Sequence, residues 1–319
     1  MSTELTTTVS VVGAPAQARE VLIDSLRDFR QSGAAPAQAT NDGQLMALWL
    51  HGRSKDTQRA YGADIKAFME YAGVELRLVT LGDVHGFADF IKTLPNGEAR
   101  ADKSQARMIA AVRSLLSFAS KIGYIGFNVG AAMRQPKIKT TIAERILSEG
   151  DTIRMLALET NPRNRALLYA FYDLGARVSE VVGLKWKDVR TDGETAIVTI
   201  YGKGSKTRFN RLSATTWQHL QAIKPAACTP DTPVFASRKG DAAITQRQAG
   251  RIVLAAAERA GISQAVSSHW LRHAHASHAL AHGAGIVEIA EQLGHSSVAV
   301  TQVYAHIAPG QSTSRYLSI

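Results

Sequence analysis

At 319 residues the chain is long enough for two domains that each bury a core, and no run approaches the roughly 18 apolar residues that would span a bilayer. Lys and Arg number 37 against 27 Asp and Glu, a formal net charge of +10 with a pI near 9.8. This excess favours nucleic acid over membrane as a partner, although many soluble proteins are basic without binding either. The single cysteine, Cys228, excludes an internal disulfide and fits a reducing cytoplasm, and the lack of Lys and Arg before the small apolar stretch Val9–Ala18 argues against a signal peptide.

The composition of residues 1–40 predicts a flexible N-terminal extension. Thr, Ala, Gly, Pro and Gln dominate there around one short helical pattern, Arg19–Arg30. From residue 41 the pattern tightens, and Leu45, Leu48 and Trp49 fall at helical spacing.

An amphipathic helix is predicted over Ser54–Met69. Its apolar side chains share one face, while its basic side chains project elsewhere. Such a helix could pack on its neighbours and still face a phosphate backbone. The apolar residues are Tyr61, Ile65, Phe68 and Met69, and the basic residues are Lys55, Arg59 and Lys66.

Two further helices are predicted in this half of the chain. One runs from about Gly82 to Leu94, before a Pro-Asn-Gly turn, and the other from about Ser104 to Ile122, before a glycine. The second helix has an apolar side and carries Arg107 and Arg113 among its cations.

The segment Gln135–Thr141 has the features of a linker. It is short and basic, with Lys137 and Lys139, and Pro136 disfavours a helix before it. An ordinary surface connection fits these residue types equally well. We therefore expect an extension over residues 1–40, a helical domain over 41–135 and a second domain over 136–319.

The second domain combines several predicted helices with one predicted hairpin. A capping pattern at Ser148–Asp151 opens a helix through Leu158, and another helix covers about Arg163–Leu174. Thr195–Tyr201 is rich in β-branched and aromatic residues and meets the sequence GKGSK at 202–206, which indicates a β-hairpin. Further helices are expected from about Thr215, Thr245, Trp270 and Val287.

Four motifs in the second domain carry groups suited to phosphodiester chemistry. They are GARVSE at 175–180, GKGSK at 202–206, HWLRH at 269–273 and LGHSSVAVTQVY at 293–304. A tyrosine hydroxyl is a useful nucleophile toward a phosphodiester only if the phosphate charge is neutralised and the leaving oxygen is protonated. Arginine suits the first task, because its planar fork donates two hydrogen bonds to one phosphate and keeps its charge.

Together these motifs resemble those of the tyrosine recombinase (phage integrase) family, in an Xer-like form, over about residues 45–310. The segment Ser54–Phe68 is similar to the core-binding domain of that family. The resemblance implies a mainly α fold with a small β-sheet (α+β), in which a helical, SAM-like core-binding domain and a catalytic domain form a C-shaped clamp on DNA. Ala176, His275 and Ser277 depart from the usual family residues, but none is a predicted reactive position.

The resemblance also implies a role for each motif. Tyr304 would be the nucleophile, Lys203 the general acid and Lys206 a backbone contact, although the residues alone do not choose between the two lysines. Glu180 could orient the site, and a carboxylate on a helix surface fits its spacing nearly as well. The implied catalytic residues are Arg177, Lys203, His269, Arg272, His295 and Tyr304, and the predicted DNA-binding residues are Lys55, Arg59, Lys66, Arg107, Arg113, Lys137, Lys139 and Lys206.

The histidines permit a second interpretation. His269 with His273, and His278 with His282, stand four residues apart, a spacing that binds zinc when both side chains share a face. No cysteine lies near, and Arg272 between the first two would repel a cation. We therefore expect no metal and no other cofactor, and a metal-dependent hydrolase stays as an alternative.

The family resemblance implies site-specific recombination through a 3′-phosphotyrosyl intermediate and a Holliday junction. The implied partners are double-stranded DNA with a specific recombination site and a homotetramer on two duplexes, with a heteromeric partner recombinase as a variant of that assembly. The implied location is the cytoplasm, at the nucleoid and away from any membrane. Type IB topoisomerase-like relaxation and a non-catalytic DNA-binding regulator stay open, and so does docking of the C-terminal residues Leu317 and Ile319 into a neighbouring protomer.

Overall fold

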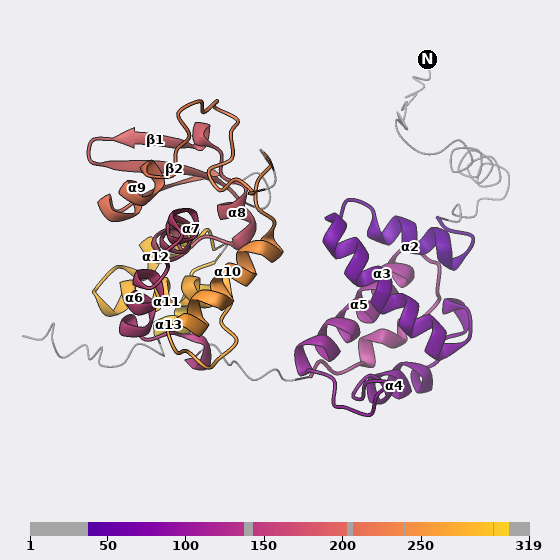
Figure 1. Ribbon diagram of the computed structural model, residues 1–319. Helices are drawn as coiled ribbons and strands as arrows, with labels where there is room; N and C mark the ends of the chain where they lie inside the picture. The colour runs from indigo at the N-terminus through magenta and orange to yellow at the C-terminus, as the bar shows by residue number, and fades with distance from the viewer. Residues whose placement is uncertain are drawn as a thin grey trace, which may run out of the picture. The chain divides into compact units, whose positions relative to one another are not determined.

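The computed structural model describes residues 38–136, 143–202, 207–238, 240, 242–295 and 297–305. The chain divides into two compact units, residues 1–139 and 140–319 (Figure 1). Each unit has its own buried apolar cluster. The predicted helix Arg19–Arg30 and residues 137–141 of the predicted linker lie outside the described residues.

The first unit is helical throughout its described residues. Three of its helices begin at side-chain caps, because Asn41, Ser54 and Thr80 each accept a hydrogen bond from a backbone N–H in the first turn. The α-helices are α2 (Asp42–Leu50), α3 (Lys55–Ala72), α4 (Leu81–Phe90) and α5 (Asp102–Lys121), with short 3-10 turns η1 (Leu76–Leu78) and η2 (Val129–Ala132).

Helix α4 ends four residues earlier than the sequence predicts. The predicted end is Leu94, but the Leu94 N–H donates to the Glu98 carbonyl at 2.7 Å, and Thr93 pairs with Ala99 as in a β-bridge. The Pro-Asn-Gly sequence between them favours this tight turn over another turn of helix.

The core of the first unit forms where α3, α4 and α5 meet. Phe68 and Phe87 pack edge to face with ring centroids 5.0 Å apart. Leu115 and Leu116 of α5 are fully buried in the same cluster. The predicted apolar faces of α3 and α5 are therefore confirmed.

The second unit is mainly helical with one small sheet. Its elements before the sheet are η3 (Ala143–Arg145), α6 (Glu149–Ala157), α7 (Pro162–Leu174), α8 (Val178–Val182) and η4 (Trp186–Asp188). The strands are β1 (Val189–Asp192), β2 (Thr195–Tyr201) and β3 (Thr207–Arg211), followed by α9 (Ala214–Gln221), α10 (Gln246–Arg259), α11 (Ser268–Ala281), α12 (Ile286–Leu293) and α13 (Ala299–Ala305).

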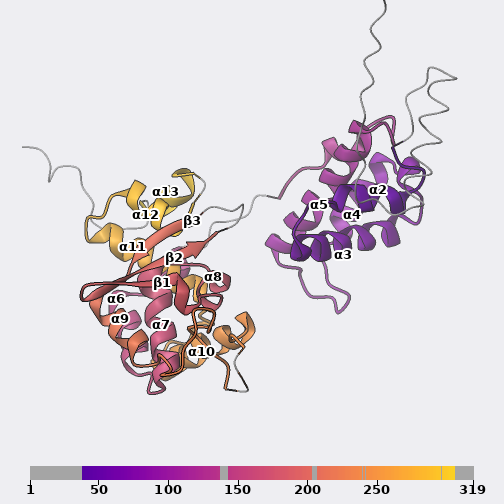
Figure 2. The ribbon, with the colours of Figure 1, turned by 90° about the horizontal axis from the view of Figure 1, so that it is seen from above.

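The sheet is an antiparallel meander in the order β1-β2-β3. The predicted hairpin is confirmed, with Tyr201 of β2 opposite Thr207 of β3, and β1 adds a third strand that the sequence did not predict. Ala196, Val198 and Ile200 face the core on alternate positions of β2. Figure 2 shows β3 on the side of the sheet where α12 lies. In agreement, Arg208 of β3 donates to the Gln292 carbonyl of α12 at 2.9 Å.

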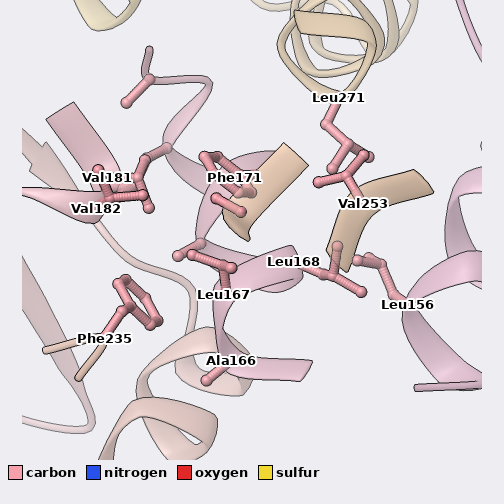
Figure 3. Close-up of a cluster of buried hydrophobic side chains, with 14 of the residues drawn as sticks. Leu156, Ala166, Leu167, Leu168, Phe171, Val181, Val182, Phe235, Val253 and Leu271 are labelled. Atoms are coloured by element: carbon pink, nitrogen blue, oxygen red, sulfur yellow. The ribbon is translucent and has the colours of Figure 1, made fainter. Parts of the chain in front are cut away.

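Helix α7 lies at the centre of the second unit. Figure 3 shows its side chains Leu167, Leu168 and Phe171 among Val253 of α10 and Leu271 of α11. All five are fully buried. Because α7 and α11 are fixed in one core, the residues at their ends have defined positions. None of the described helices is both long enough and apolar enough to cross a membrane.

Candidate active site

Arg177 lies at the junction of α7 and α8. Helix α7 ends at Leu174 and is capped by Gly175, whose φ of +56° is a left-handed conformation that favours glycine. A Cβ atom at this position would lie 2.7 Å from side-chain atoms of His275 and Leu293. Glycine therefore permits both the turn and the close approach of α11 and α12, and Arg177 follows in extended conformation with its side chain 39% exposed.

Glu180 binds two arginines from different elements. Its carboxylate accepts from the backbone N–H of Arg177 at 2.8 Å and from the Arg177 guanidinium at 2.9 Å. Arg208 of β3 donates to the same carboxylate at 2.7 and 3.2 Å. The Glu180 side chain is only 5% exposed, so it is not a helix-surface carboxylate. Burial opposes its ionisation, but the hydrogen bonds from Arg208 and Arg177 hold its pKa below the ordinary value.

Arg272 is a buried guanidinium held by the ends of two helices. It donates to the Gly175 carbonyl at 2.7 Å and to the Leu293 carbonyl at 2.9 Å, at the C-termini of α7 and α12, where carbonyls have no partner within the helix. Only 6% of the residue is exposed. Burial and the nearby charge of Arg177 lower its pKa to about 10, so it stays protonated at neutral pH.

Tyr304 of α13 is buried, with 4% of its surface exposed. Its hydroxyl lies 2.7 Å from Nδ1 of His273. Burial raises the pKa of this phenol, and the positive charge of Arg272 acts in the opposite direction. The phenol is therefore protonated at neutral pH and held beside an imidazole. Its apolar neighbours are Ala276, Leu280, Ile289 and Leu293.

His295 and His269 lie within the field of the same arginines. The His295 Nδ1 lies 2.7 Å from the buried Thr301 hydroxyl, and burial together with Arg272 and Arg177 lowers the pKa of His295 to about 4. His269 is exposed at the surface, yet partial desolvation and the same two arginines lower its pKa as well. Both imidazoles are therefore uncharged near neutral pH.

The fold gathers motifs that are separated by more than a hundred residues in sequence. Arg177 reaches the Gly294 carbonyl, at 3.4 Å between Nη2 and the oxygen, and Arg272 joins the ends of α7 and α12. The predicted lysines 203 and 206 lie outside the described residues. The described members of the predicted catalytic set, which all lie in this cluster, are Arg177, His269, Arg272, His295 and Tyr304.

Three side chains of this cluster were not among the predicted catalytic or supporting residues. Arg208 joins β3 to Glu180, His273 contacts the Tyr304 hydroxyl and Thr301 contacts His295. His273 could have been found from the sequence, since it lies one helical turn after His269. Arg208 gave no such signal, because its role depends on how β3 pairs and packs.

The predicted DNA-binding cations of the first unit differ in their contacts. Lys55 and Arg59 are exposed on α3, and Arg113 is half-buried on α5. Arg107 donates to the buried Asp64 at 2.5 Å, and this ion pair links α5 to α3. Lys66 is exposed, with its Nζ 3.7 Å from the Glu70 carboxylate. The linker lysines, Lys137 and Lys139, lie outside the described residues.

A second group of arginines surrounds a cavity of about 260 Å³ near the start of α10. Arg163, Arg238 and Arg251 line it together with Gln248 and Ser237. Among the described residues, no carboxylate forms an ion pair with any of the three. Burial lowers the pKa of Arg163, and the positive charge of Arg238 lowers it further. The sequence does not reveal this cavity, because its arginines come from three separate segments.

The histidine spacing does not produce a metal site in the part of the chain that the structure describes. There, no three His, Cys, Asp or Glu side chains come together in an arrangement that could hold a metal ion. His278 instead lies 2.9 Å from the Tyr172 hydroxyl and 3.0 Å from the Leu147 carbonyl, and His282 lies 3.2 Å from Glu149.

Known proteins are similar in sequence to most of this chain. The sequence pattern described as "Phage integrase family" matches residues 143–311, and that of "Phage integrase, N-terminal SAM-like domain" matches residues 45–123. Tyrosine recombinase XerC of Thermodesulfovibrio yellowstonii is 31% identical over 270 residues, which cover 80% of this chain and 87% of that protein. The chain belongs to the phage integrase family. Tyrosine recombinase XerD of Bifidobacterium longum is 30% identical over 289 residues, which cover 84% of this chain and 92% of that protein.

Membership of the phage integrase family confirms the predicted enzyme class, a site-specific tyrosine recombinase. Solved structures of the family share the fold. XerH bound to its difH substrate matches 93% of this chain and 87% of its own at 20% identity, with a TM-score of 0.64. A lambda integrase dimer bound to a COC′ core site matches 94% and 90% at 16% identity, with a TM-score of 0.66. The predicted mainly α fold with a small sheet is confirmed, while the clamp shape stays a prediction.

Proposed function

We propose that this tyrosine recombinase cuts DNA by attack of the Tyr304 hydroxyl on a backbone phosphorus. The attack forms a 3′-phosphotyrosyl bond and releases a 5′ hydroxyl, which can later attack the phosphotyrosine and rejoin the strand. The observation that carries the proposal is the placement of Arg272 beside Tyr304 and at the same helix ends as Arg177. Bond energy is kept in the intermediate, so the exchange requires no nucleotide.

The two arginines would stabilise the charge that develops on the nonbridging oxygens. Arg272 is already oriented by the Gly175 and Leu293 carbonyls, and Arg177 by Glu180, so little reorganisation is needed when the phosphate arrives. His269 and His295, uncharged near neutral pH, would bind the phosphate oxygens through hydrogen bonds. Lys203, by family resemblance, would protonate the leaving 5′ oxygen.

Contacts away from the reacting phosphate would position the duplex. We infer that Arg163, Arg238 and Arg251 bind a backbone phosphate, because three guanidiniums without a carboxylate partner among the described residues favour an anion. Exposed cations such as Lys55 and Arg59 would supply contacts from the first unit. These contacts are independent of base sequence, so they would fix the register of the protein on DNA rather than its target.

Strand exchange between two duplexes would require four active sites. One solved relative, with a TM-score of 0.63, is a lambda integrase tetramer bound to a Holliday junction. We propose the same assembly for this chain, formed by four copies or together with a second recombinase, at the nucleoid in the cytoplasm. The curated relatives of 30% identity or more include both a XerC and a XerD, which supports either composition.

The test uses purified protein and duplex fragments that tile the DNA around its own gene. Wild-type protein and the Tyr316→Phe variant should form a covalent protein–DNA adduct on the fragment that carries the site, seen as a shifted band on a denaturing gel. Tyr304→Phe should bind the same fragment and form no adduct. An adduct with Tyr304→Phe, or none with Tyr316→Phe, would contradict the proposal.

A further inference from the structure

The proton of the Tyr304 hydroxyl must leave as the oxygen attacks phosphorus, and an acceptor lies beside it. His273 Nδ1 is 2.7 Å from the hydroxyl oxygen, within the range of a hydrogen bond between neutral groups. We propose that His273 accepts this proton in the cleavage step and is therefore a catalytic residue. The inference rests on the proposed role of Tyr304 and extends it to a residue outside the predicted catalytic set.

The surroundings of Tyr304 explain why an acceptor is needed. The tyrosine is 4% exposed and packs on apolar side chains of α11 and α12, so bulk water has little access to its hydroxyl. A free phenolate in that environment would be costly. Transfer of the proton to an imidazole during the attack avoids a separate charged intermediate on Tyr304.

The other histidines of the site are poorly placed for this task. His295 directs Nδ1 to the Thr301 hydroxyl at 2.7 Å, and its pKa of about 4 makes it a weak base. His269 lies next to His273, with ring centroids 6.5 Å apart, but the imidazole in hydrogen-bond contact with the Tyr304 hydroxyl is that of His273.

Helix α11 holds His273 in a fixed position. The residue directly before it, Arg272, donates to two helix ends, and the residue directly after it, Ala274, is fully buried. The imidazole is therefore oriented toward Tyr304 before DNA binds, as expected for a preorganised proton acceptor.

The proton and electron pairs balance in the proposed step. The Tyr304 oxygen forms a bond to phosphorus while its O–H bond breaks, and the proton moves to Nδ1 of His273. The bond from phosphorus to the 5′ oxygen breaks, and that oxygen takes a proton from the general acid. On rejoining, the 5′ hydroxyl returns its proton to the deprotonated general acid as its oxygen attacks phosphorus, and the departing Tyr304 oxygen recovers its proton from His273.

The first experiment measures single-turnover adduct formation on the fragment that wild-type protein cleaves. His273→Ala should fold and bind this fragment as wild type does, and it should form the adduct about 100-fold more slowly or worse, the typical size of an acid–base contribution. A matched control is His278→Ala on the same helix, which removes an analogous His–Tyr hydrogen bond of 2.9 Å to Tyr172, away from the site. This control should cleave at close to the wild-type rate per folded molecule.

Two substrate and side-chain changes separate proton transfer from a structural role. Replacing the tyrosines by 3,5-difluorotyrosine, whose phenol is more acidic, should restore a large part of the rate that His273→Ala has lost. A 5′-bridging phosphorothiolate substrate, whose thiolate leaves without a proton, should rescue Lys203→Ala but not His273→Ala. Wild-type rates for His273→Ala, no gain with difluorotyrosine, or rescue by the phosphorothiolate would each overturn the role of His273 while the Tyr304 adduct itself remained.

Discussion

Among single residues, Glu180 makes more contacts within the site than its sequence motif predicted. Its buried carboxylate holds the guanidinium of Arg177, the backbone N–H of Arg177 and the guanidinium of Arg208. Through Arg208, which also donates to the Gln292 carbonyl, this contact extends to the end of α12. Spacing alone placed Glu180 one helical turn from Arg177 and did not reveal that it is buried.

Glu180→Gln should destabilise the second unit and slow DNA cleavage. Removing one charge of a buried ion pair leaves the other uncompensated, a loss on the order of 3 kcal/mol. Urea unfolding at pH 7 measures this, with Asp192→Asn as the control, because Asp192 pairs with Arg211 at an exposed position. If the two variants lose equal stability, Glu180 does not organise the arginines.

The stability of the protein should fall as the pH falls below about 6.5, in part because of His295. The unfolded chain takes up a proton at His295 near its ordinary pKa of 6.5, whereas burial and the arginines hold the folded value to about 4. Between these two pH values the unfolded state binds more protons, so stability decreases with acidification. His295→Asn lacks this proton, and it should lose less stability than wild type between pH 7 and 4.5 in thermal unfolding. Identical losses would refute the assigned shift, since the other histidines are common to both chains.

At the scale of elements, local sequence signals predicted most helices because caps and apolar spacing act over short distances. Ser148, for example, accepts from the Asp151 N–H and opens α6 as predicted. Local sequence signals did not predict the features that depend on tertiary contacts. Strand β1 forms by pairing with β2, and the site role of Arg208 follows from the packing of β3 on α12. The motif residues themselves and Glu180 beside Arg177 were predictable, but the contacts of Arg208 with Glu180 and of Thr301 with His295 were not.

Gly175→Ala tests the junction of α7 with α11 and α12. Two effects add: a left-handed φ costs a non-glycine residue about 1 kcal/mol, and the new Cβ would lie 2.7 Å from His275 and Leu293. Gly261→Ala carries the first effect alone, since its φ is +70° and its Cβ would meet no atom within 4 Å. We expect Gly175→Ala to lose clearly more stability than Gly261→Ala, and also to lose cleavage activity because the Gly175 carbonyl orients Arg272.

A glycine inside a helix serves as a control, because replacing it by alanine should change stability in the opposite direction. Gly250 lies in α10, and a Cβ added there would meet no atom within 4 Å, so Gly250→Ala should raise stability by up to about 1 kcal/mol. Chemical unfolding of the three variants under the same conditions gives the order. Equal losses for Gly175→Ala and Gly261→Ala would mean that the helix junction tolerates a side chain.

For the whole molecule, the net charge of +10 predicts DNA binding that weakens steeply with salt. The logarithm of the binding constant should fall linearly with the logarithm of salt concentration as phosphate contacts release counterions. In the proposed function, the arginines around the cavity at α10 contribute to this overall electrostatic binding and do not contact the reacting phosphate.

Arg163→Ala and Arg251→Ala should each weaken binding uniformly across DNA sequences. Each should reduce the salt slope by about 1, the change expected for one lost phosphate contact. Arg190→Ala removes the same charge from the exposed strand β1 and should leave the slope closer to wild type. Fluorescence anisotropy with a random-sequence duplex over a range of salt concentrations measures the slopes, and equal slopes for all three variants would refute a phosphate site at the cavity.

The central claim is that folding brings one tyrosine and two arginines together around a single DNA phosphorus. Digesting the covalent adduct with protease and nuclease, then mapping the nucleotide remnant by mass spectrometry, tests it most directly. The remnant should be attached to Tyr304 through a 3′ phosphate in wild-type protein, and it should vanish when Arg177 or Arg272 is replaced by alanine. A remnant on Tyr316 or any other residue, or one attached through a 5′ phosphate, would contradict the account.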